Sequence, residues 1–457
     1  MKTWKKWTLA GMVGLAIWGS PAFGQVEDLA KKLKSDDVAT RKAAAYSLGR
    51  MGPQARTAVG ALADALSDQD ANVRRSAAIA LGNIGPAAKP AVPKLIAAFK
   101  NSDARVKRAV AFALSSMGPM AREAASTLAS AADDADVGVR TSVAAAMASF
   151  GPGAKEVVPT LQKMLKDNDL MVRQTAVMGL GKLGANAGTT VMDMAALLND
   201  PDATLRSQVA TSLGMLGVSS RTAVAALAKA TEDSEEMVRQ SAILSLGKMG
   251  PSARAAVPAI GKLIKDPNPE IRYSAAYSLA EIGPDAKLAV GALVEGLDDS
   301  DLQVVRECIY ALGEIGVDAK AALPDLAKFF KHPNPDVRKD AIDAISVMGP
   351  SASGLVMPLA QVLIGDKSDH VRLSAAYAIN EMGPAGKPAV GALINAMKND
   401  TYNGVREECA HALAAIRVGG PTVMNALKEA ADSSDPALSQ AAKLALEDLK
   451  SLSGGDN

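Results

Sequence analysis

Apolar residues recur at helical spacing along most of the chain, in pairs of short runs separated by polar breaks. Within residues 86–118, the segment 92–100 is apolar at helical spacing and residues 101–103 form a polar break. A second periodic run covers 104–117 and ends before Gly118. No segment alternates with the period of two that a strand requires. The pattern predicts an all-α chain whose unit is a helix, a short loop and a second helix.

This two-helix unit repeats every 33 residues. A glycine, often followed by proline, ends each unit, and all steps between these glycines are 33 residues except the last, which is 34. A basic residue recurs in phase near the start of the second helix, with Val305-Arg306 shifted by one position. Self-similarity at this period predicts a solenoid, in which each unit buries its apolar face against its neighbours. The glycines are Gly52, Gly85, Gly118, Gly151, Gly184, Gly217, Gly250, Gly283, Gly316, Gly349 and Gly383, and the basic residues are Arg41, Arg74, Lys107, Arg140, Arg173, Arg206, Arg239, Arg272, Arg338, Arg372 and Arg406.

The second helix of each unit carries a capping signal. Four residues before the basic position stands Asp in most units, which can accept a hydrogen bond from a free N–H at the helix start. A positive residue in the first helical turn opposes the helix dipole and needs a negative partner. We therefore expect a structural ladder of Arg and Asp side chains along the loops, which ties each repeat to itself or to the next. A column of Ala, Ser or Gly six residues beyond the basic position predicts close helix packing.

The segment 70–86 has the pattern D-x-x-V-R-x-x-A-A-x-A-L-G-x-I-G-P. It resembles the HEAT-like repeats, in particular the short class also found in phycobilin lyases. The resemblance covers almost the whole chain and implies an α-solenoid of about 12–13 two-helix repeats that winds as a right-handed superhelix. It also implies that the second helices line the concave side. The matching residues belong to caps, core and turns, so the resemblance indicates little about function.

The first 24 residues differ from the repeats. Three lysines precede an apolar run over residues 7–18, and the small residues Ala22 and Gly24 stand where cleavage would need them. This is typical of a secretory signal peptide, and an uncleaved anchor is the alternative. We expect an exported chain, periplasmic or secreted, without membrane insertion after cleavage. The expected organisation is a signal peptide at 1–24, a HEAT-like repeat solenoid at 25–450 and a disordered tail at 451–457.

Composition and short motifs limit the partners and the reactive sites that we expect. The 50 basic and 49 acidic residues give a net charge of +1, which does not suggest nucleic acid or an anionic membrane as partner. Cys308 and Cys409 fall three repeats apart, about 30 Å at usual helix spacing, so we expect two buried thiols and no disulfide. No His-Glu dipeptide, C-x-x-C, G-x-S-x-G or P-loop occurs. We expect no cofactor, metal site or catalytic residue. The three histidines are His332, His370 and His411.

The positions that vary between repeats form a stripe on the second helices. Residues one, five and nine beyond the basic position share a helix face, and five of the six tyrosines lie there. The charge of the stripe changes from basic in early repeats to acidic in late ones. Exposed Tyr beside charges is typical of a binding surface, although the column could instead be half-buried filler between repeats. The predicted binding residues are Tyr46, Arg75, Arg108, Phe112, Tyr273, Tyr277, Glu281, Tyr310, Glu314, Tyr377 and Glu381.

These observations favour an exported, non-enzymatic scaffold that binds a protein or an extended peptide on the concave face of the solenoid. Two other classes stay open at this stage. One is an enzyme similar to the phycobilin lyases, which would act on a large or chromophoric substrate. The other is a structural spacer of the cell envelope without a specific ligand. The sequence does not identify the partner, the process or the oligomeric state.

Overall fold

A computed structural model describes residues 21–217 and 220–453, and within these ranges all regular structure is helical. Two compact units divide the chain, Met1–Ala187 (unit 1) and Gly188–Asn457 (unit 2). The all-α fold is therefore confirmed. Most of the expected signal peptide lies outside the described residues, and its last four residues open α1 (Pro21–Lys32). No described helix is both long and apolar enough to cross a bilayer.

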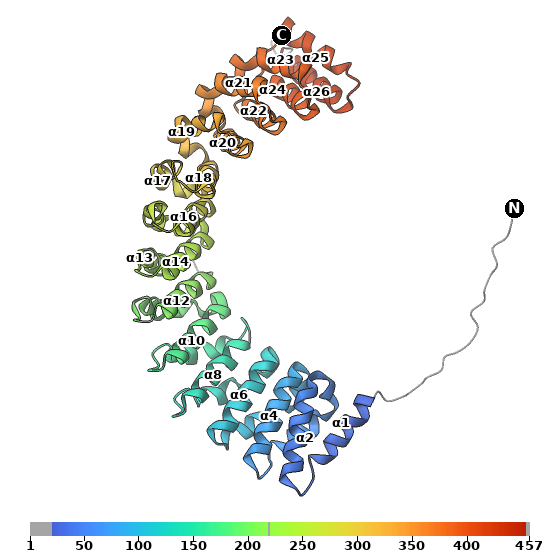
Figure 1. Ribbon diagram of the computed structural model, residues 1–457, viewed down its shortest axis with the longest axis vertical. Helices are drawn as coiled ribbons and strands as arrows, with labels where there is room; N and C mark the ends of the chain where they lie inside the picture. The colour runs from blue at the N-terminus through green and yellow to red at the C-terminus, as the bar shows by residue number, and fades with distance from the viewer. Residues whose placement is uncertain (1–20, 218–219, 454–457) are drawn as a thin grey trace, which may run out of the picture. The chain divides into compact units, whose positions relative to one another are not determined.

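In unit 1, the helices stack side by side in two layers, with the second helices of successive repeats in contact with one another (Figure 1). Each second helix also contacts the first helix of its own repeat. The first helices are α1 (Pro21–Lys32), α3 (Val59–Ala65), α5 (Val92–Lys100), α7 (Ala125–Ala129) and α9 (Val158–Met164); the second helices are α2 (Val38–Met51), α4 (Ala71–Ile84), α6 (Ala104–Met117), α8 (Val137–Ser149) and α10 (Leu170–Leu183).

Unit 2 repeats the same two-layered plan, and its second helices lie on the inner side of the bend that the row follows (Figure 1). The last helix runs three residues past the expected end of the solenoid at residue 450, and residues 454–457 lie outside the described chain. The first helices are α11 (Val191–Ala196), α13 (Arg221–Ala230), α15 (Val257–Lys262), α17 (Val290–Gly296), α19 (Leu323–Lys328), α21 (Val356–Gly365), α23 (Val390–Asn399) and α25 (Pro421–Ala431); the second helices are α12 (Ala203–Met215), α14 (Glu236–Lys248), α16 (Pro269–Ile282), α18 (Leu302–Ile315), α20 (Pro335–Val347), α22 (Asp369–Glu381), α24 (Asn403–Ala415) and α26 (Pro436–Ser453).

The segments between repeats are mostly short 3₁₀ helices, which the sequence analysis did not predict. Each repeat-ending glycine has a positive φ, as at Gly85 with φ 74° and ψ −141°. This backbone conformation differs from the left-handed helical one that is usual after a helix, and residues with a Cβ atom rarely adopt it. The 3₁₀ helices are η1 (Gly52–Ala58), η2 (Gly85–Ala91), η3 (Gly118–Ala124), η4 (Lys155–Val157), η5 (Gly184–Thr190), η6 (Leu197–Asn199), η7 (Gly250–Ala256), η8 (Leu263–Lys265), η9 (Gly283–Ala289), η10 (Gly316–Ala322), η11 (Phe329–Lys331), η12 (Gly349–Leu355) and η13 (Gly383–Ala389).

The predicted caps are present at most second helices. Asp70, for example, accepts from the backbone N–H groups of Asn72 and Val73 at 2.8 and 3.1 Å. Glu235 and Ser368 occupy the same position without a side-chain cap bond. The side chains that do cap are those of Asp37, Asp70, Asp103, Asp136, Asp169, Asp202, Asn268, Asp301, Asn334 and Asp435.

Small residues control how closely the second helices approach. A Cβ added at Gly49 of α2 would lie 3.1 Å from the Cα atom of Ala80 of α4. The same relation joins Gly313 to Ala344, again at 3.1 Å. Both alanines belong to the small-residue column of the sequence, so that column packs against a second one in the preceding repeat. The short approach leaves room only for Gly, Ala or Ser at the contact.

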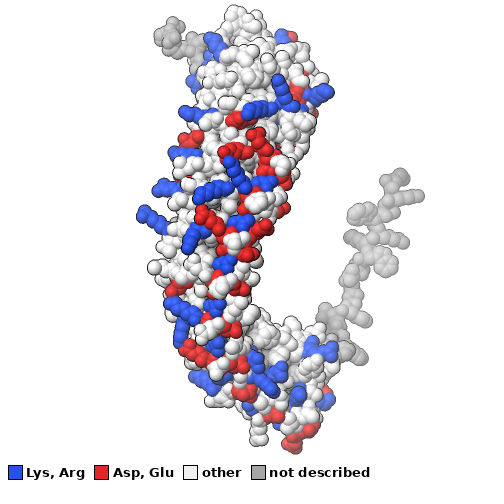
Figure 2. All heavy atoms as spheres, turned by 60° about the vertical axis from the view of Figure 1, so that its left-hand side comes forward, with Lys and Arg blue, Asp and Glu red and all other residues white. Residues whose placement is uncertain are grey.

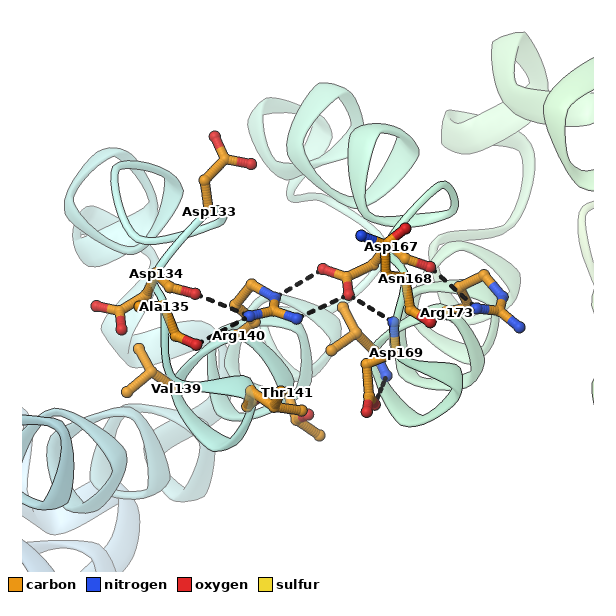
Figure 3. Close-up of polar contacts among 12 residues, drawn as sticks. Asp133, Asp134, Ala135, Val139, Arg140, Thr141, Asp167, Asn168, Asp169 and Arg173 are labelled. Atoms are coloured by element: carbon orange, nitrogen blue, oxygen red, sulfur yellow. Dashed lines mark hydrogen bonds and ion pairs between the residues drawn. The ribbon is translucent and has the colours of Figure 1, made fainter.

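The expected ladder of Arg and Asp exists, and Arg140 shows its geometry (Figure 3). Its Nε and Nη2 donate to the two carboxylate oxygens of Asp167 in the next repeat, at 2.7 and 2.9 Å. Nη1 donates at 2.8 Å to the carbonyl oxygen of Asp134 in the loop before its own helix. Asp167 also accepts from the N–H of Asp169 at 2.9 Å. One guanidinium thus joins its own loop to that of the next repeat.

The acidic partner in this ladder is not the cap residue but the residue two positions before the next cap. The hydrogen bond from Arg41 is the main cause that holds the pKa of Asp68 below its ordinary value. In Asp167 burial opposes ionisation, yet the bonds from Arg140 and the Asp169 N–H still lower the pKa. The ladder pairs are Arg41–Asp68, Lys107–Asp134, Arg140–Asp167, Arg206–Asp233, Arg239–Asp266, Arg272–Asp299, Arg338–Asp366 and Arg372–Asp400.

The ladder is interrupted at α4, where Asn101 stands at the acid position, and in a different way at α18. Val305 occupies the position of the arginine, and His332 occupies the position of its acidic partner. Arg306, one residue further on, pairs instead with Asp340 of α20, its Nε lying 2.6 Å from the carboxylate. The shift of one residue recognised in the sequence therefore redirects the guanidinium to a different helix.

Candidate binding surface

All eleven predicted binding residues lie on second helices and are exposed to solvent. Tyr277 is 39% exposed and Tyr310 is 54% exposed. Each ring is thus accessible to solvent on part of its surface and packed on the rest, as both a binding residue and the half-buried filler of the alternative interpretation would be. The structure places four of the residues in unit 1 and seven in unit 2, so they form two surfaces that are described separately.

The unit 1 surface is basic and lies on α4 and α6. Arg75, Arg105, Arg108 and Phe112 line a hollow of about 480 Å³ between these helices. Arg108 has a distant acidic neighbour, with 3.9 Å between its Nε and a carboxylate oxygen of Asp136. Tyr46 lies on α2 and does not line the hollow. Arg105 was not among the predicted residues because it precedes the basic column instead of following it.

The unit 2 surface combines tyrosine with glutamate, and we call it the Tyr–Glu surface. On three helices a tyrosine stands four residues before a glutamate, a spacing that places both side chains on one face. Glu307 of α18 adds a half-buried carboxylate that the sequence analysis missed. The sequence feature that could have identified Glu307 is its position three residues before Tyr310. The surface consists of Tyr273, Tyr277 and Glu281 on α16, Glu307, Tyr310 and Glu314 on α18, and Tyr377 and Glu381 on α22.

The carboxylates of this surface act on the neighbouring hydroxyl groups. The negative charge of Glu281 is the main cause that raises the pKa of Tyr277. The charge of Glu307 does the same to the pKa of Tyr273. Burial, reinforced by the charge of Glu281, raises the pKa of Glu307 itself. The surface therefore presents tyrosine hydroxyls and carboxylates within reach of one another.

A hollow of about 480 Å³ lies on the Tyr–Glu surface between α18 and α20. Glu307, Tyr310 and Glu314 line it from α18, while Asp343 and Val347 line it from α20. The volume falls within the usual range for binding sites of small groups. The hollow coincides with the interruption of the ladder at α18, because Arg306 and Asp340 also line it.

Elsewhere on the protein, charges of opposite sign lie next to one another, as the face in Figure 2 shows. Exposed pairs such as Lys163–Asp133 and Lys262–Glu232 link neighbouring repeats. Exposed ion pairs of this kind contribute little to stability.

The described residues bring no three His, Cys, Asp or Glu side chains together as metal ligands. Cys308 and Cys409 are free and buried, as the sequence predicts. Burial raises the pKa of the Cys308 thiol to about 12, so this group is not a thiolate at neutral pH. His332 uses Nδ1 to accept the N–H of Asn334 at 3.2 Å, which assigns it a role in the loop.

Comparison with known families agrees with the repeat plan. The family model for HEAT repeats matches almost the whole described chain in overlapping segments. No curated protein matches the sequence. The matched segments are residues 26–115, 61–148, 92–181, 125–196, 191–256, 251–312, 290–355 and 356–447.

Solved structures with a similar fold include Kap95p bound to RanGDP, with a TM-score of 0.51 and 14% identity over 94% of this chain. The match spans 66% of that chain. Importin beta is similar with a TM-score of 0.48 and 14% identity, over 95% of this chain and 69% of the other. At this identity the likeness concerns the fold alone.

Proposed function

The chain belongs to the HEAT-repeat family, and from this premise we propose that it is an exported, non-enzymatic scaffold that binds a protein or an extended peptide. Stacked helical repeats create long surfaces of this kind. The observation that carries the proposal is the exposed row of tyrosines on the second helices of unit 2. Tyr offers apolar area and a hydrogen-bonding hydroxyl with few rotatable bonds to immobilise on binding.

The non-enzymatic part of the proposal is supported by the state of the reactive groups. Cys308 is a buried thiol with a raised pKa, and His332 is used within its own loop. The ladder Asp side chains are each held by a guanidinium or an ammonium group. The proposal of export is supported by the lysines and the apolar run that precede Ala22.

The test is capture of the partner with the Tyr277→Ala/Tyr310→Ala double variant. Full-length wild type and variant are immobilised and exposed to envelope extract of the source cells, and specifically retained proteins are quantified. We expect at least about a tenfold loss of the retained partner, because exposed aromatic anchors carry much of the affinity of an interface. Thermal unfolding should change little, since both rings are exposed.

Leu288→Ala is the matched control. Leu288 lies on η9 in the same unit, is more exposed than either tyrosine and lies off the second helices. It should retain the partner as wild type does. A large loss of stability in the tyrosine double variant would show that the rings serve packing and would contradict the proposal. A coloured or metal-bearing preparation of the wild type would instead favour an enzyme.

A further inference from the structure

The Tyr–Glu surface carries negative charge that the protein itself leaves without a cationic partner. In the hollow between α18 and α20, Arg306 offsets Asp340 at 2.6 Å. Lys339 likewise offsets Asp343, with 2.5 Å between nitrogen and oxygen. Both compensated carboxylates belong to α20. Each of these two α20 carboxylates is therefore paired with a cation, one from α18 and one from α20 itself.

The opposite wall, formed by α18, is different. Among the residues that the structure describes, no Lys, Arg or His forms an ion pair with Glu307 or Glu314. Tyr310, whose pKa is raised by burial and by the charge of Glu314, lies between the two carboxylates in the chain. Holding two carboxylates in a partly enclosed hollow without a cationic partner costs free energy. An incoming cation would remove that cost.

The hollow also has an apolar rim. Tyr310 is 54% exposed and Val347 is 60% exposed, and they belong to the two opposite helices. A ligand that fits both parts has an apolar stem and a cationic head, as Lys and Arg side chains have. The tyrosine ring can add a cation–π contact with the head group.

The same chemistry continues beyond the hollow. Tyr277 and Glu281 on α16, and Tyr377 and Glu381 on α22, repeat the pairing of Tyr310 with Glu314. No described Lys or Arg forms an ion pair with Glu281 or Glu381. A ligand that follows the second helices thus meets tyrosine and unpaired glutamate several times.

We infer that the Tyr–Glu surface binds a basic, extended segment of a partner protein, and that the hollow between α18 and α20 receives one of its Lys or Arg side chains. This inference rests on the proposed scaffold function and adds the chemistry of the partner. Charge complementarity selects this occupant. An acidic segment would meet repulsion along α16, α18 and α22.

The test uses a fluorescently labelled peptide of alternating Lys and Gly as the probe, with binding to the full chain followed by anisotropy. We expect Glu307→Gln/Glu314→Gln to weaken binding about tenfold or more, since both charges face the ligand. Glu314→Gln alone should weaken it less and is an exposed change that leaves the fold intact. Binding should also weaken as salt is raised.

Two controls separate the hollow from general charge attraction. Arg75→Gln/Arg105→Gln alters the hollow of equal size in unit 1 and should leave affinity for the probe unchanged or slightly higher. A peptide in which 2,4-diaminobutyrate replaces Lys keeps a protonated side-chain amine at neutral pH on a stem two carbons shorter, and it should bind several-fold more weakly because it cannot reach the carboxylates across the rim.

Equal binding of the Lys peptide to wild type and to Glu307→Gln/Glu314→Gln would overturn the inference, as would no binding to wild type. Equal binding of the two peptides would overturn insertion into the hollow. Loss of partner capture by the tyrosine double variant, together with no binding of the Lys peptide, would leave the scaffold function standing and refute only the basic partner.

Discussion

Arg140→Met is the change that tests most directly how the repeats hold together. Methionine keeps an unbranched apolar stem of similar length and removes only the guanidinium. The wild-type guanidinium makes two bonds to Asp167 and one of 2.8 Å to the carbonyl oxygen of Asp134. The side chains of Arg140 and Asp167 are 14% and 11% exposed, so the variant leaves a largely buried carboxylate without its cation.

Removing one partner of a buried ion pair typically costs about 3–5 kcal/mol. Asp167 keeps its bond from the Asp169 N–H, which partly stabilises the remaining charge. We therefore expect a loss near the lower end, about 3 kcal/mol of the free energy of unfolding. Lys163→Met is the matched control, because Lys163 and Asp133 join the same two repeats but are 60% and 73% exposed. Its cost should stay below about 1 kcal/mol.

The assay is urea unfolding followed by circular dichroism, together with hydrogen exchange of the loops before α8 and α10. The variant should open these loops preferentially, since each repeat is stabilised by its nearest neighbours. Arg140→Met/Asp167→Leu should recover part of the loss, because no buried charge then remains. An Arg140→Met protein as stable as Lys163→Met would refute the structural role of the ladder.

The pH dependence of the same variant follows from the lowered pKa of Asp167. A carboxylate whose pKa is lower in the folded than in the unfolded state adds stability above its unfolded pKa, and this is lost as pH falls through its folded pKa. The free energy of unfolding of the wild type should therefore fall as the pH drops below 3.8, the ordinary pKa of the Asp167 carboxyl. The difference between wild type and Arg140→Met should shrink over the same range, because protonated Asp167 no longer needs its cation. A difference that stays constant with pH would assign the loss to packing instead of charge.

Two further predictions concern packing and processing. Gly247→Ala should destabilise the protein by about 1–3 kcal/mol, because its Cβ would lie 2.7 Å from Ser278 Oγ and 3.1 Å from Ser278 Cα. Gly291→Ala meets no heavy atom within 4 Å and should stabilise its helix by about 0.5–1 kcal/mol, so thermal unfolding of the two variants should shift in opposite directions. Intact-mass measurement of protein recovered from its own cells should show a chain that begins at Gln25, and retention of residues 1–24 would refute signal cleavage.

Most of the fold could be predicted from the sequence because the determinants of each repeat are local. A cap such as Asp70 and a turn glycine such as Gly85 act within a few residues of their position, and the 33-residue period makes each prediction checkable many times. The 3₁₀ helices were not predicted, since short segments such as η2 contain Pro and Gly and show no clear helical period. The positive φ of the turn glycines follows from the residue type, but their ψ depends on the packing of the following segment.

The candidate site was only partly predictable. The helical spacing of Tyr310 and Glu314 was enough to place them on one exposed face. Glu307 was missed because its importance depends on two neighbouring helices, which bring it beside Tyr273 and into the hollow. The acid column of the ladder was missed for a different reason. Asp167 does recur in phase along the sequence, but the cap two residues later offered a simpler partner for the arginine.

The interruption of the ladder at α18 places Arg306 and Asp340 in the lining of the hollow. Successive residues of an α-helix point about 100° apart, so moving the arginine from position 305 to 306 turns it from the loop toward the binding face. There it holds Asp340 and forms one wall of the hollow. With no arginine at 305, an acid at 332 would be left half-buried without a cation. His332 instead accepts a hydrogen bond from the N–H of Asn334. The ladder aspartates of other repeats make the same bond to the residue two positions later, as Asp167 does with the N–H of Asp169. The changes at positions 305 and 332 therefore belong together. This loop has no ion pair to the neighbouring repeat, and the guanidinium of Arg306 lies instead on the surface that we propose binds the partner.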